Sequence, residues 1–150
     1  MKIIVDANII FSGILNTNSK IGDLLINSKN QFEFIAPDFL RIEIKKHYSR
    51  LCKISGLTLY QIQEAEFQLY KDITFISEEQ IKLSIWLSAE KLVADIDPKD
   101  IVYIAFSKHF RCKIWSGDKV LIKELKKKHF INFVTSTELF NLREQLNGNK

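Results

Sequence analysis

Short apolar runs alternate along the chain with longer segments of helical period. The runs are rich in β-branched and aromatic residues, which is typical of buried strands; they comprise Lys2–Val5, Phe32–Ala36, Ile73–Ile76, Cys112–Trp115 and Ile131–Val134. Between them, apolar residues recur every three or four positions, as at Leu40, Ile44, Tyr48 and Leu51 and at Ile81, Ile85, Ala89 and Leu92. Strands that alternate with helices predict a three-layer α/β fold around an open, mainly parallel sheet of about five strands.

Three capping boxes mark expected helix starts. In such a box the first hydroxyl accepts from the third backbone amide, and the Glu or Gln side chain reaches back to the first. The boxes are Thr58–Gln61, Ser77–Gln80 and Thr135–Glu138. We therefore expect helices to begin directly after Thr58, Ser77 and Thr135.

Composition limits the class of protein. The chain has 150 residues, 46% apolar and 27% charged, which predicts one ordinary globular domain over residues 1–150 rather than a disordered chain. Two cysteines, Cys52 and Cys112, build neither a disulfide framework nor a metal motif. Asp6 interrupts the apolar start, which argues against a signal peptide and a membrane span. The sequence thus predicts a soluble, cytoplasmic protein, and its net charge of +4 suits an anionic partner.

Acidic residues follow the expected strands. In open parallel sheets, ligands bind beyond the carboxyl ends of the strands. Asp6 follows the first strand and Asp118 the fourth, while Glu43 lies in the early turns of the helix after the second. Asp97 and Asp100 stand at the start of a later helix. These five carboxylates are the candidate functional residues.

Each of these acids also has a structural interpretation. Asp97, which precedes a proline, is a good helix N-cap, and Asp100 at the third helical position favours the helix dipole. Glu43 fits a solvated helix face, and Asp118 fits a turn after glycine. Asp6 is the exception, because an acid at the end of a hydrophobic strand has little structural purpose.

The acids together indicate a cation site. If the first and fourth strands are neighbours, Asp6 and Asp118 meet at one edge of the sheet, and the helix that carries Asp100 can reach them. Two carboxylates ~5 Å apart repel by about 3 kcal/mol at an effective dielectric constant of ~20, so the cluster must hold protons or cations. Oxygen ligands without Cys or His favour Mg²⁺ or Mn²⁺.

Four segments resemble the PIN-domain ribonucleases, in particular the VapC-like toxins of toxin–antitoxin pairs. These segments are DANIIFSGIL at 6–15, the helix of Glu43, DIDPKDIVYIAFS, and IWSGDK. The resemblance implies that the metal-binding, catalytic acids are Asp6, Glu43, Asp100 and Asp118. It implies supporting roles for Asn8, Ser116 and Asp97. The implied activity is hydrolysis of RNA by a metal-activated water without a protein nucleophile, with a small antitoxin protein as partner.

Basic residues follow two of the acids. An acidic, metal-loaded site rimmed by positive charge suits a polyanion, and the candidate RNA-binding residues are Lys45, Lys46, Arg50, Lys119 and Lys123. The alternative is that these side chains are solvated helix faces. The surplus of apolar residues in the middle helices predicts either helix packing or an interface with a second copy or a small partner; it comprises Phe67, Leu69, Tyr70, Trp86 and Leu87.

Other functions fit less well. A haloacid-dehalogenase-type phosphatase needs Asp at position 8 and an acid at position 122, where this chain has Asn8 and Ile122. A response-regulator receiver needs paired acids after the first strand, which are absent from the sequence. The remaining alternatives are a stand-alone RNA-processing or decay nuclease, and a PIN-fold module that binds RNA or protein without cleavage.

Overall fold

The computed structural model describes residues 1–148 and contains one five-stranded parallel sheet. Its order is β3-β2-β1-β4-β5, and every neighbouring pair is parallel. The strands are β1 (Lys2–Val5), β2 (Glu33–Pro37), β3 (Ile73–Ile76), β4 (Lys113–Trp115) and β5 (Phe133–Val134). The predicted open parallel sheet is confirmed, and the predicted strands match within one or two residues.

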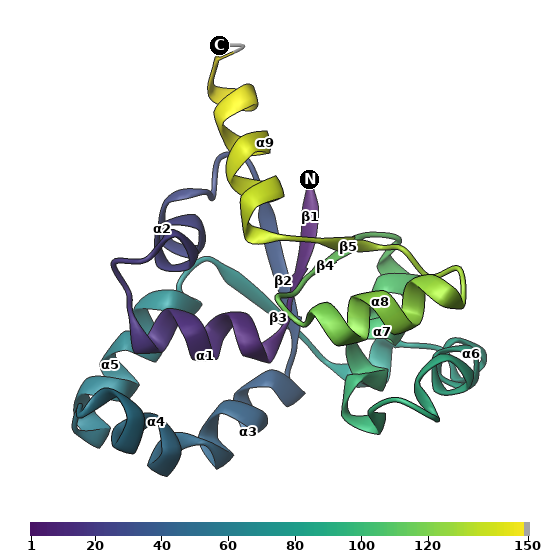
Figure 1. The fold of residues 1–150 in the computed structure, drawn as a ribbon, viewed down its shortest axis with the longest axis horizontal. Coiled ribbons are helices and arrows are strands. Elements are labelled where there is room, and N and C mark those ends of the chain that lie inside the picture. The colour runs from purple at the N-terminus through teal and green to yellow at the C-terminus, as the bar shows by residue number, and fades with distance from the viewer. Residues whose placement is uncertain (149–150) are drawn as a thin grey trace.

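Helices cover both sides of the sheet (Figure 1). On one side lie α1 (Ala7–Leu15), α3 (Phe39–Lys46), α4 (Tyr48–Ser55) and α5 (Leu59–Tyr70), with α2 (Lys20–Asn27) near them. On the other side lie α6 (Leu83–Val93), α7 (Ile101–Phe110) and α8 (Lys119–Lys127). Two short 3-10 helices precede α6 and α7, namely η1 (Glu78–Gln80) and η2 (Pro98–Asp100). The three-layer arrangement agrees with the prediction.

The core is centred on β1 and α7. Residues 3–5 of β1 are completely buried, as expected for a central strand covered on both faces. Six consecutive residues of α7, 102–107, are buried because this helix is enclosed between the sheet and α6. The rings of Phe34 and Trp115 lie 5.5 Å apart between their centroids, across the strands next to β1. Dense packing of this kind holds the strand ends in place.

Two of the three capping boxes form as expected. The box of Thr58 is complete, and Thr135 and Glu138 exchange the two expected bonds. The prediction for Ser77 is wrong, because its hydroxyl accepts from the second amide, that of Glu79, and caps only η1. The chain is extended at Ile81, which follows η1. Therefore α6 begins only at Leu83.

The first apolar stripe spans two helices rather than one. Leu40 and Ile44 are buried on α3, and Leu51 is buried on α4, but the chain leaves the helical conformation at His47. The second stripe begins before α6, whose fully buried positions are Ala89 and Val93. Spacing thus predicted the buried face but missed the break and the helix start.

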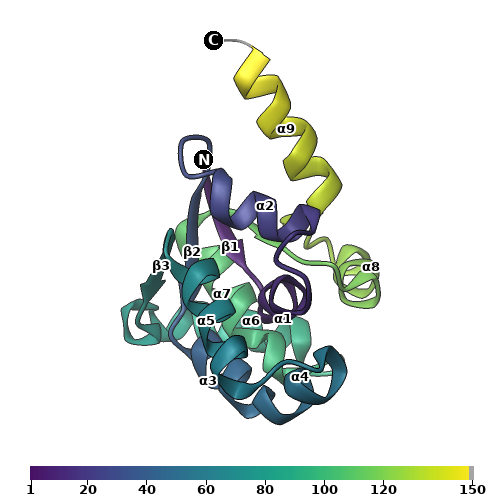
Figure 2. The ribbon, with the colours of Figure 1, turned by 90° about the vertical axis from the view of Figure 1, so that its left-hand side faces the viewer.

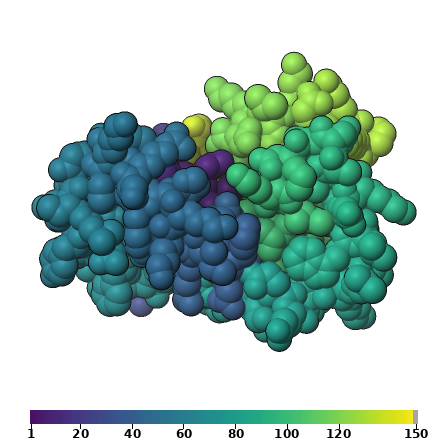
Figure 3. All heavy atoms as spheres, turned by 90° about the horizontal axis from the view of Figure 1, so that it is seen from below, coloured from purple at the N-terminus to yellow at the C-terminus, as the bar shows by residue number. Residues whose placement is uncertain are grey.

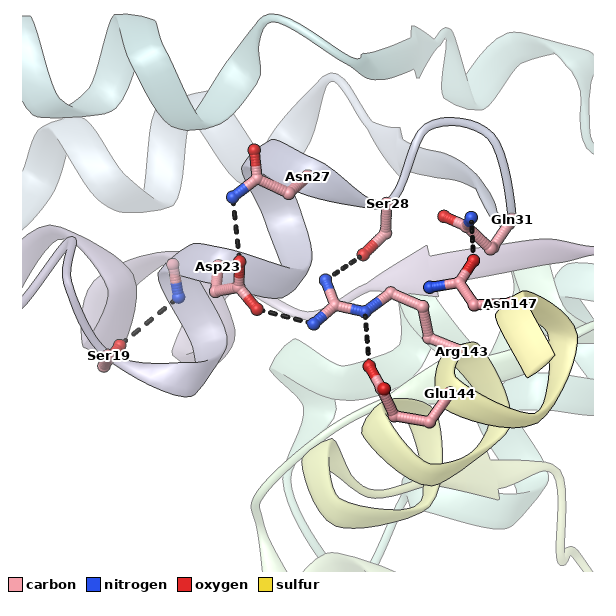
Figure 4. Close-up of polar contacts among 9 residues, drawn as sticks. Ser19, Asp23, Asn27, Ser28, Gln31, Arg143, Glu144 and Asn147 are labelled. Carbon is pink, nitrogen blue, oxygen red and sulfur yellow. Dashed lines mark hydrogen bonds and ion pairs between the residues drawn. The ribbon is translucent and has the colours of Figure 1, made fainter.

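The last helix, α9 (Ser136–Gly148), projects from the body of the molecule (Figure 2). Arg143 fixes it to α2, as Figure 4 shows. This arginine is only 7% exposed; it donates to Ser28 Oγ at 3.0 Å and to Asp23 Oδ2 at 2.6 Å. The same contact holds the pKa of Asp23 below its usual value. No helix in the described part of the chain is long and apolar enough to cross a membrane.

Candidate active site

Asp6 lies at the point where the chain switches from one half of the sheet to the other. From β1 the chain continues to β2 and β3 on one side, and it later returns to β4 and β5 on the other. Ligands of open parallel sheets bind at such a point. Asp6 is 5% exposed; its Oδ1 accepts from the backbone amide of Asn8 at 3.0 Å, and its Oδ2 accepts from Ser116 Oγ at 2.8 Å. Burial is the main reason why the pKa of Asp6 is raised.

Ser116 connects Asp6 to Asp118. The Ser116 hydroxyl is completely buried and donates to Asp6, while its oxygen accepts from the backbone amide of Asp118 at 3.1 Å. Asp118 caps α8 by accepting from the amide of Leu121 at 3.0 Å. The structure therefore brings Asp6 and Asp118 to one sheet edge, since β1 and β4 are neighbours. The charge of Asp118 contributes to the raised pKa of Asp6.

Asp100 faces the other acids from the beginning of α7. Its pKa is raised to about 7, first by burial and then by the charges of Asp6, Asp97, Asp118 and Glu43. Its side chain makes no capping hydrogen bond. We call these five carboxylates the acidic site.

Asp97 and Asp100 differ from each other in local role. Asp97 is an N-cap as predicted, because it accepts from the amide of Lys99 at 3.0 Å. The helix that it caps is η2, not an α-helix. Asp100 is the third residue of η2, as predicted for a helix that Asp97 caps, and it is also the N-cap of α7.

Glu43 reaches the acidic site from α3. It is half-buried, and its Oε1 accepts from the Tyr103 hydroxyl at 2.7 Å. Burial raises the pKa of Glu43, and the hydrogen bond from Tyr103 opposes that rise. Sequence reasoning missed Tyr103; the available signal was one polar group within an otherwise apolar stretch that follows Asp100.

Asn8 contacts Asp6 through its backbone rather than its side chain, because Asp6 is the N-cap of α1. The amide of Asn8 donates to Asp6, whereas the residue itself is exposed. It lines two hollows beside the acidic site: one of about 180 Å³ next to Glu43, and one of about 310 Å³ next to Asp118. Phe11 on α1 lines both hollows. Figure 3 shows the N-terminal segment at the bottom of a hollow between the segment of α3 and α4 and the later helices.

All five predicted nucleic-acid contacts are exposed, and they lie on three helices. Lys45 and Lys46 belong to α3, Arg50 to α4, and Lys119 and Lys123 to α8. The Arg50 guanidinium lies 5.3 Å from the centroid of the Phe11 ring, within the range of cation–π attraction.

His47 packs its ring edge-on against Phe11, with the two centroids 6.1 Å apart. Phe11 and His47 line the same hollow as Arg50 and Glu43. Sequence reasoning did not select Phe11 or His47 as site residues. The two residues are far apart in sequence, on α1 and between α3 and α4, so their contact was not visible in either segment.

The donors of the acidic site suit a hard divalent cation. Its side chains offer carboxylate oxygens, the ligands that Mg²⁺ and Mn²⁺ prefer. Such an ion neutralises negative charge, and negative charge is concentrated around Asp100. The charges of four other carboxylates raise the pKa of this residue. Among residues 1–148, however, no three His, Cys, Asp or Glu side chains form a preassembled metal group. The acids are therefore near enough to affect one another's pKa, but they do not form a ready-made set of ligands.

The fold and the acidic site together define an α/β protein with an all-oxygen site at the switch point of a parallel sheet. Residues 4–136 match the PIN domain family, so the chain belongs to that family. Its fold is similar to that in the crystal structure of VapBC2 from Rickettsia felis bound to a DNA fragment from their promoter. The TM-score is 0.67 at 10% identity, and the match covers 90% of this chain and 98% of the other. No curated protein sequence matches the chain.

Proposed function

We propose that this protein is a metal-dependent endoribonuclease that hydrolyses RNA phosphodiester bonds. The observation that carries this proposal is the proximity of Asp6, Glu43 and Asp118, from separate elements, to Asp100, whose pKa their charges raise. Membership of the PIN domain family supports it, as do the motifs that resemble PIN-domain ribonucleases. An uncompensated acid cluster is costly, so it indicates function rather than stability.

Each acid has a role that follows from its surroundings. Asp6, Asp100 and Asp118 would hold Mg²⁺ or Mn²⁺ directly or through water, with Glu43 closing the site. An ion held there would supply a water of lowered pKa and positive charge to offset that of the scissile phosphate. Ser116 orients Asp6 through its buried hydroxyl, and the backbone amide of Asn8 holds the other oxygen. Fixing both oxygens of one carboxylate in this way keeps it aimed at the site.

The RNA contacts extend from the acidic site along α3, α4 and α8. The exposed lysines and Arg50 neutralise phosphates, and Phe11 offers a ring face in the hollow beside Glu43. Phosphate contacts position a nucleic acid, and aromatic faces stack on unpaired bases. This combination supports single-stranded RNA as substrate.

A toxin role with a small protein partner is the second part of the proposal. The structural neighbour is a VapBC2 assembly, and the motif resemblance implies an antitoxin. The surplus apolar residues of the middle helices fall into two groups. Leu69 is buried and Tyr70 packs on Phe75, so these two belong to the helix packing. Phe67 and Leu87 are 64% and 51% exposed.

An apolar hollow of about 290 Å³ lies beside α6 and is lined by Trp86, Phe39 and Ile42, among others. This surface fits a partner peptide or a second copy. Coexpression with the product of a neighbouring short reading frame, followed by size-exclusion chromatography, tests the antitoxin. A monodisperse monomer that does not bind a hydrophobic dye contradicts the interface.

The nuclease is tested by incubating the purified chain with a mixed RNA pool in Mg²⁺ or Mn²⁺, with EDTA as a blank. We expect metal-dependent cleavage that Asp100→Asn abolishes. Asp95→Asn is the matched control, because Asp95 is an exposed acid paired with Lys128 outside the acidic site. Folded protein that binds RNA but cleaves none under any condition supports the non-catalytic alternative. Cleavage without any toxicity on expression supports a processing or decay nuclease.

A further inference from the structure

The buried hydroxyl of Tyr103 connects two helices, α7 and α3, that border the acidic site. Tyr103 lies on α7, one turn after Asp100, and is only 3% exposed. Its oxygen donates to Glu43 on α3 at 2.7 Å. The backbone amide of Ala7, the residue that follows Asp6, lies near the same oxygen and opposes the rise of the Tyr103 pKa. A hydroxyl in this apolar stretch of α7 is costly unless it is hydrogen-bonded, and its partner Glu43 is one of the acids of the site.

We propose that Tyr103 is a positioning residue that holds the Glu43 carboxylate in the acidic site. This inference rests on the proposed function, because it assigns a role toward a bound divalent ion. α3 packs mainly against α1 and α4 rather than against α7. The long Glu43 side chain therefore needs an anchor from α7 to stay beside Asp100, and the Tyr103 hydroxyl is that anchor.

The bond leaves Glu43 free to act. A phenol donates a single hydrogen, and here it goes to Oε1 of Glu43. The other carboxylate oxygen, Oε2, keeps its lone pairs for a cation or a water. Groups that orient a ligand in this way affect metal affinity without touching the metal.

Tyr103→Phe tests the proposal, because it removes one oxygen and keeps the ring. We expect Mn²⁺ affinity, measured by electron paramagnetic resonance of the free ion, to fall about 10- to 100-fold. We expect kcat for RNA cleavage to fall while KM for RNA stays within about twofold of wild type. Tyr70→Phe is the matched control, since it deletes a half-buried hydroxyl that donates to Glu66 at 3.1 Å, away from the acidic site. Its Mn²⁺ affinity should equal that of wild type.

A double-mutant cycle separates positioning from a general packing effect. If Tyr103 acts through Glu43, adding Tyr103→Phe to Glu43→Gln causes no further loss of Mn²⁺ affinity. Two outcomes overturn the proposal: Mn²⁺ affinity of Tyr103→Phe within twofold of wild type, or losses that multiply in the double variant. If neither Glu43→Gln nor Asp100→Asn weakens Mn²⁺ binding or cleavage, it is the proposed function that fails.

A measurement on wild-type protein avoids dependence on the folding of Tyr103→Phe. The chain has four tyrosines, so ¹³Cζ-tyrosine labelling gives four resonances. That of Tyr103 is assigned by elimination with Phe substitutions at the other three. We expect Mg²⁺ to shift the Tyr103 resonance in wild type and not in Glu43→Gln. A Tyr103 resonance that Mg²⁺ does not shift, in protein that binds the ion, overturns the proposal.

Discussion

The raised pKa of Asp100 predicts that the metal-free protein loses stability as the pH rises. Its pKa is about 7 in the folded chain against an ordinary value of 3.8, chiefly because of burial and then because of the neighbouring acids. The folded state thus binds this proton more tightly than the unfolded state. The stabilising contribution of protonated Asp100 is complete below about pH 3.8 and is lost as the pH rises through about 7. Asp100→Asn, which stays neutral, keeps that contribution at every pH.

The size of the effect follows from linkage. A shift from 3.8 to about 7 corresponds to about 4 kcal/mol, at 1.36 kcal/mol per pKa unit. Asp100 is only partly buried, so screening by solvent reduces this to about 2 kcal/mol. The substitution loses no capping hydrogen bond, because the Asp100 side chain makes none. We therefore expect Asp100→Asn to raise the free energy of unfolding by about 2 kcal/mol at pH 7.5 and to leave it unchanged at pH 4.

Urea unfolding followed by far-UV circular dichroism in EDTA measures this difference at pH 4, 5.5 and 7.5. Asp95→Asn is the control. The ion pair with Lys128 lowers the pKa of Asp95, so this variant should show no gain at pH 7.5. A gain for Asp100→Asn that is equal at pH 4 and pH 7.5 would refute the reasoning, because the gain would then not come from ionisation.

Divalent ions extend the same test. If the acids repel one another in the metal-free chain, a bound cation removes the repulsion and adds its own binding energy. At 100 times its Kd, an ion that binds only the folded state stabilises it by about 2.7 kcal/mol. We expect Mg²⁺ at pH 7.5 to stabilise wild type by about this amount and Asp100→Asn by much less. Equal stabilisation of both proteins would place the ion elsewhere.

Three further substitutions test separate parts of the structure. Ser116→Ala removes the hydroxyl that orients Asp6, so cleavage should fall about 10- to 100-fold and urea unfolding should show a loss of about 1–3 kcal/mol. Arg143→Met breaks the contact of α9 with Asp23; we expect a loss of about 1–3 kcal/mol in urea unfolding with an unchanged cleavage rate, and a slower rate would show that α9 supports the acidic site. Arg50→Ala should weaken binding of single-stranded RNA and reduce the slope of log K against log salt by about 0.7, as measured by fluorescence anisotropy; an unchanged slope excludes a phosphate contact.

The fold was predictable because its signals are local. Strands such as Lys2–Val5 are apolar runs that end at an acid, and burial on both faces of a central strand produces that pattern. The adjacency of β1 and β4, which brings Asp6 and Asp118 together, follows from the usual order of open parallel sheets. The errors lie where a contact from elsewhere decides the outcome. One oxygen of Glu78 accepts from the amide of Phe39, so the segment after Ser77 is tied to α3.

The parts of the site that could not be predicted depend on partners distant in sequence. Glu43 and Tyr103 are 60 residues apart, and neither shows in its own neighbourhood that it meets the other. The same is true of Arg143, whose contacts Asp23 and Ser28 are 120 and 115 residues away. A polar group within an apolar segment signals that some partner exists, but it does not identify the partner.

The acids of the site are held with unequal firmness, and this bears on how a cation enters. Asp6 and Asp118 follow adjacent strands, and the side chain of each accepts from a backbone amide. Ser116 also binds both residues, through the Asp6 carboxylate and the Asp118 amide. Asp100 has no capping bond, and Glu43 is held by a single phenol from another helix. Fewer hydrogen bonds therefore fix the second pair than the first. On the proposed function, Asp6 and Asp118 would be the firmly held ligands of a divalent ion, and Asp100 and Glu43 would be the ligands free to adjust to it.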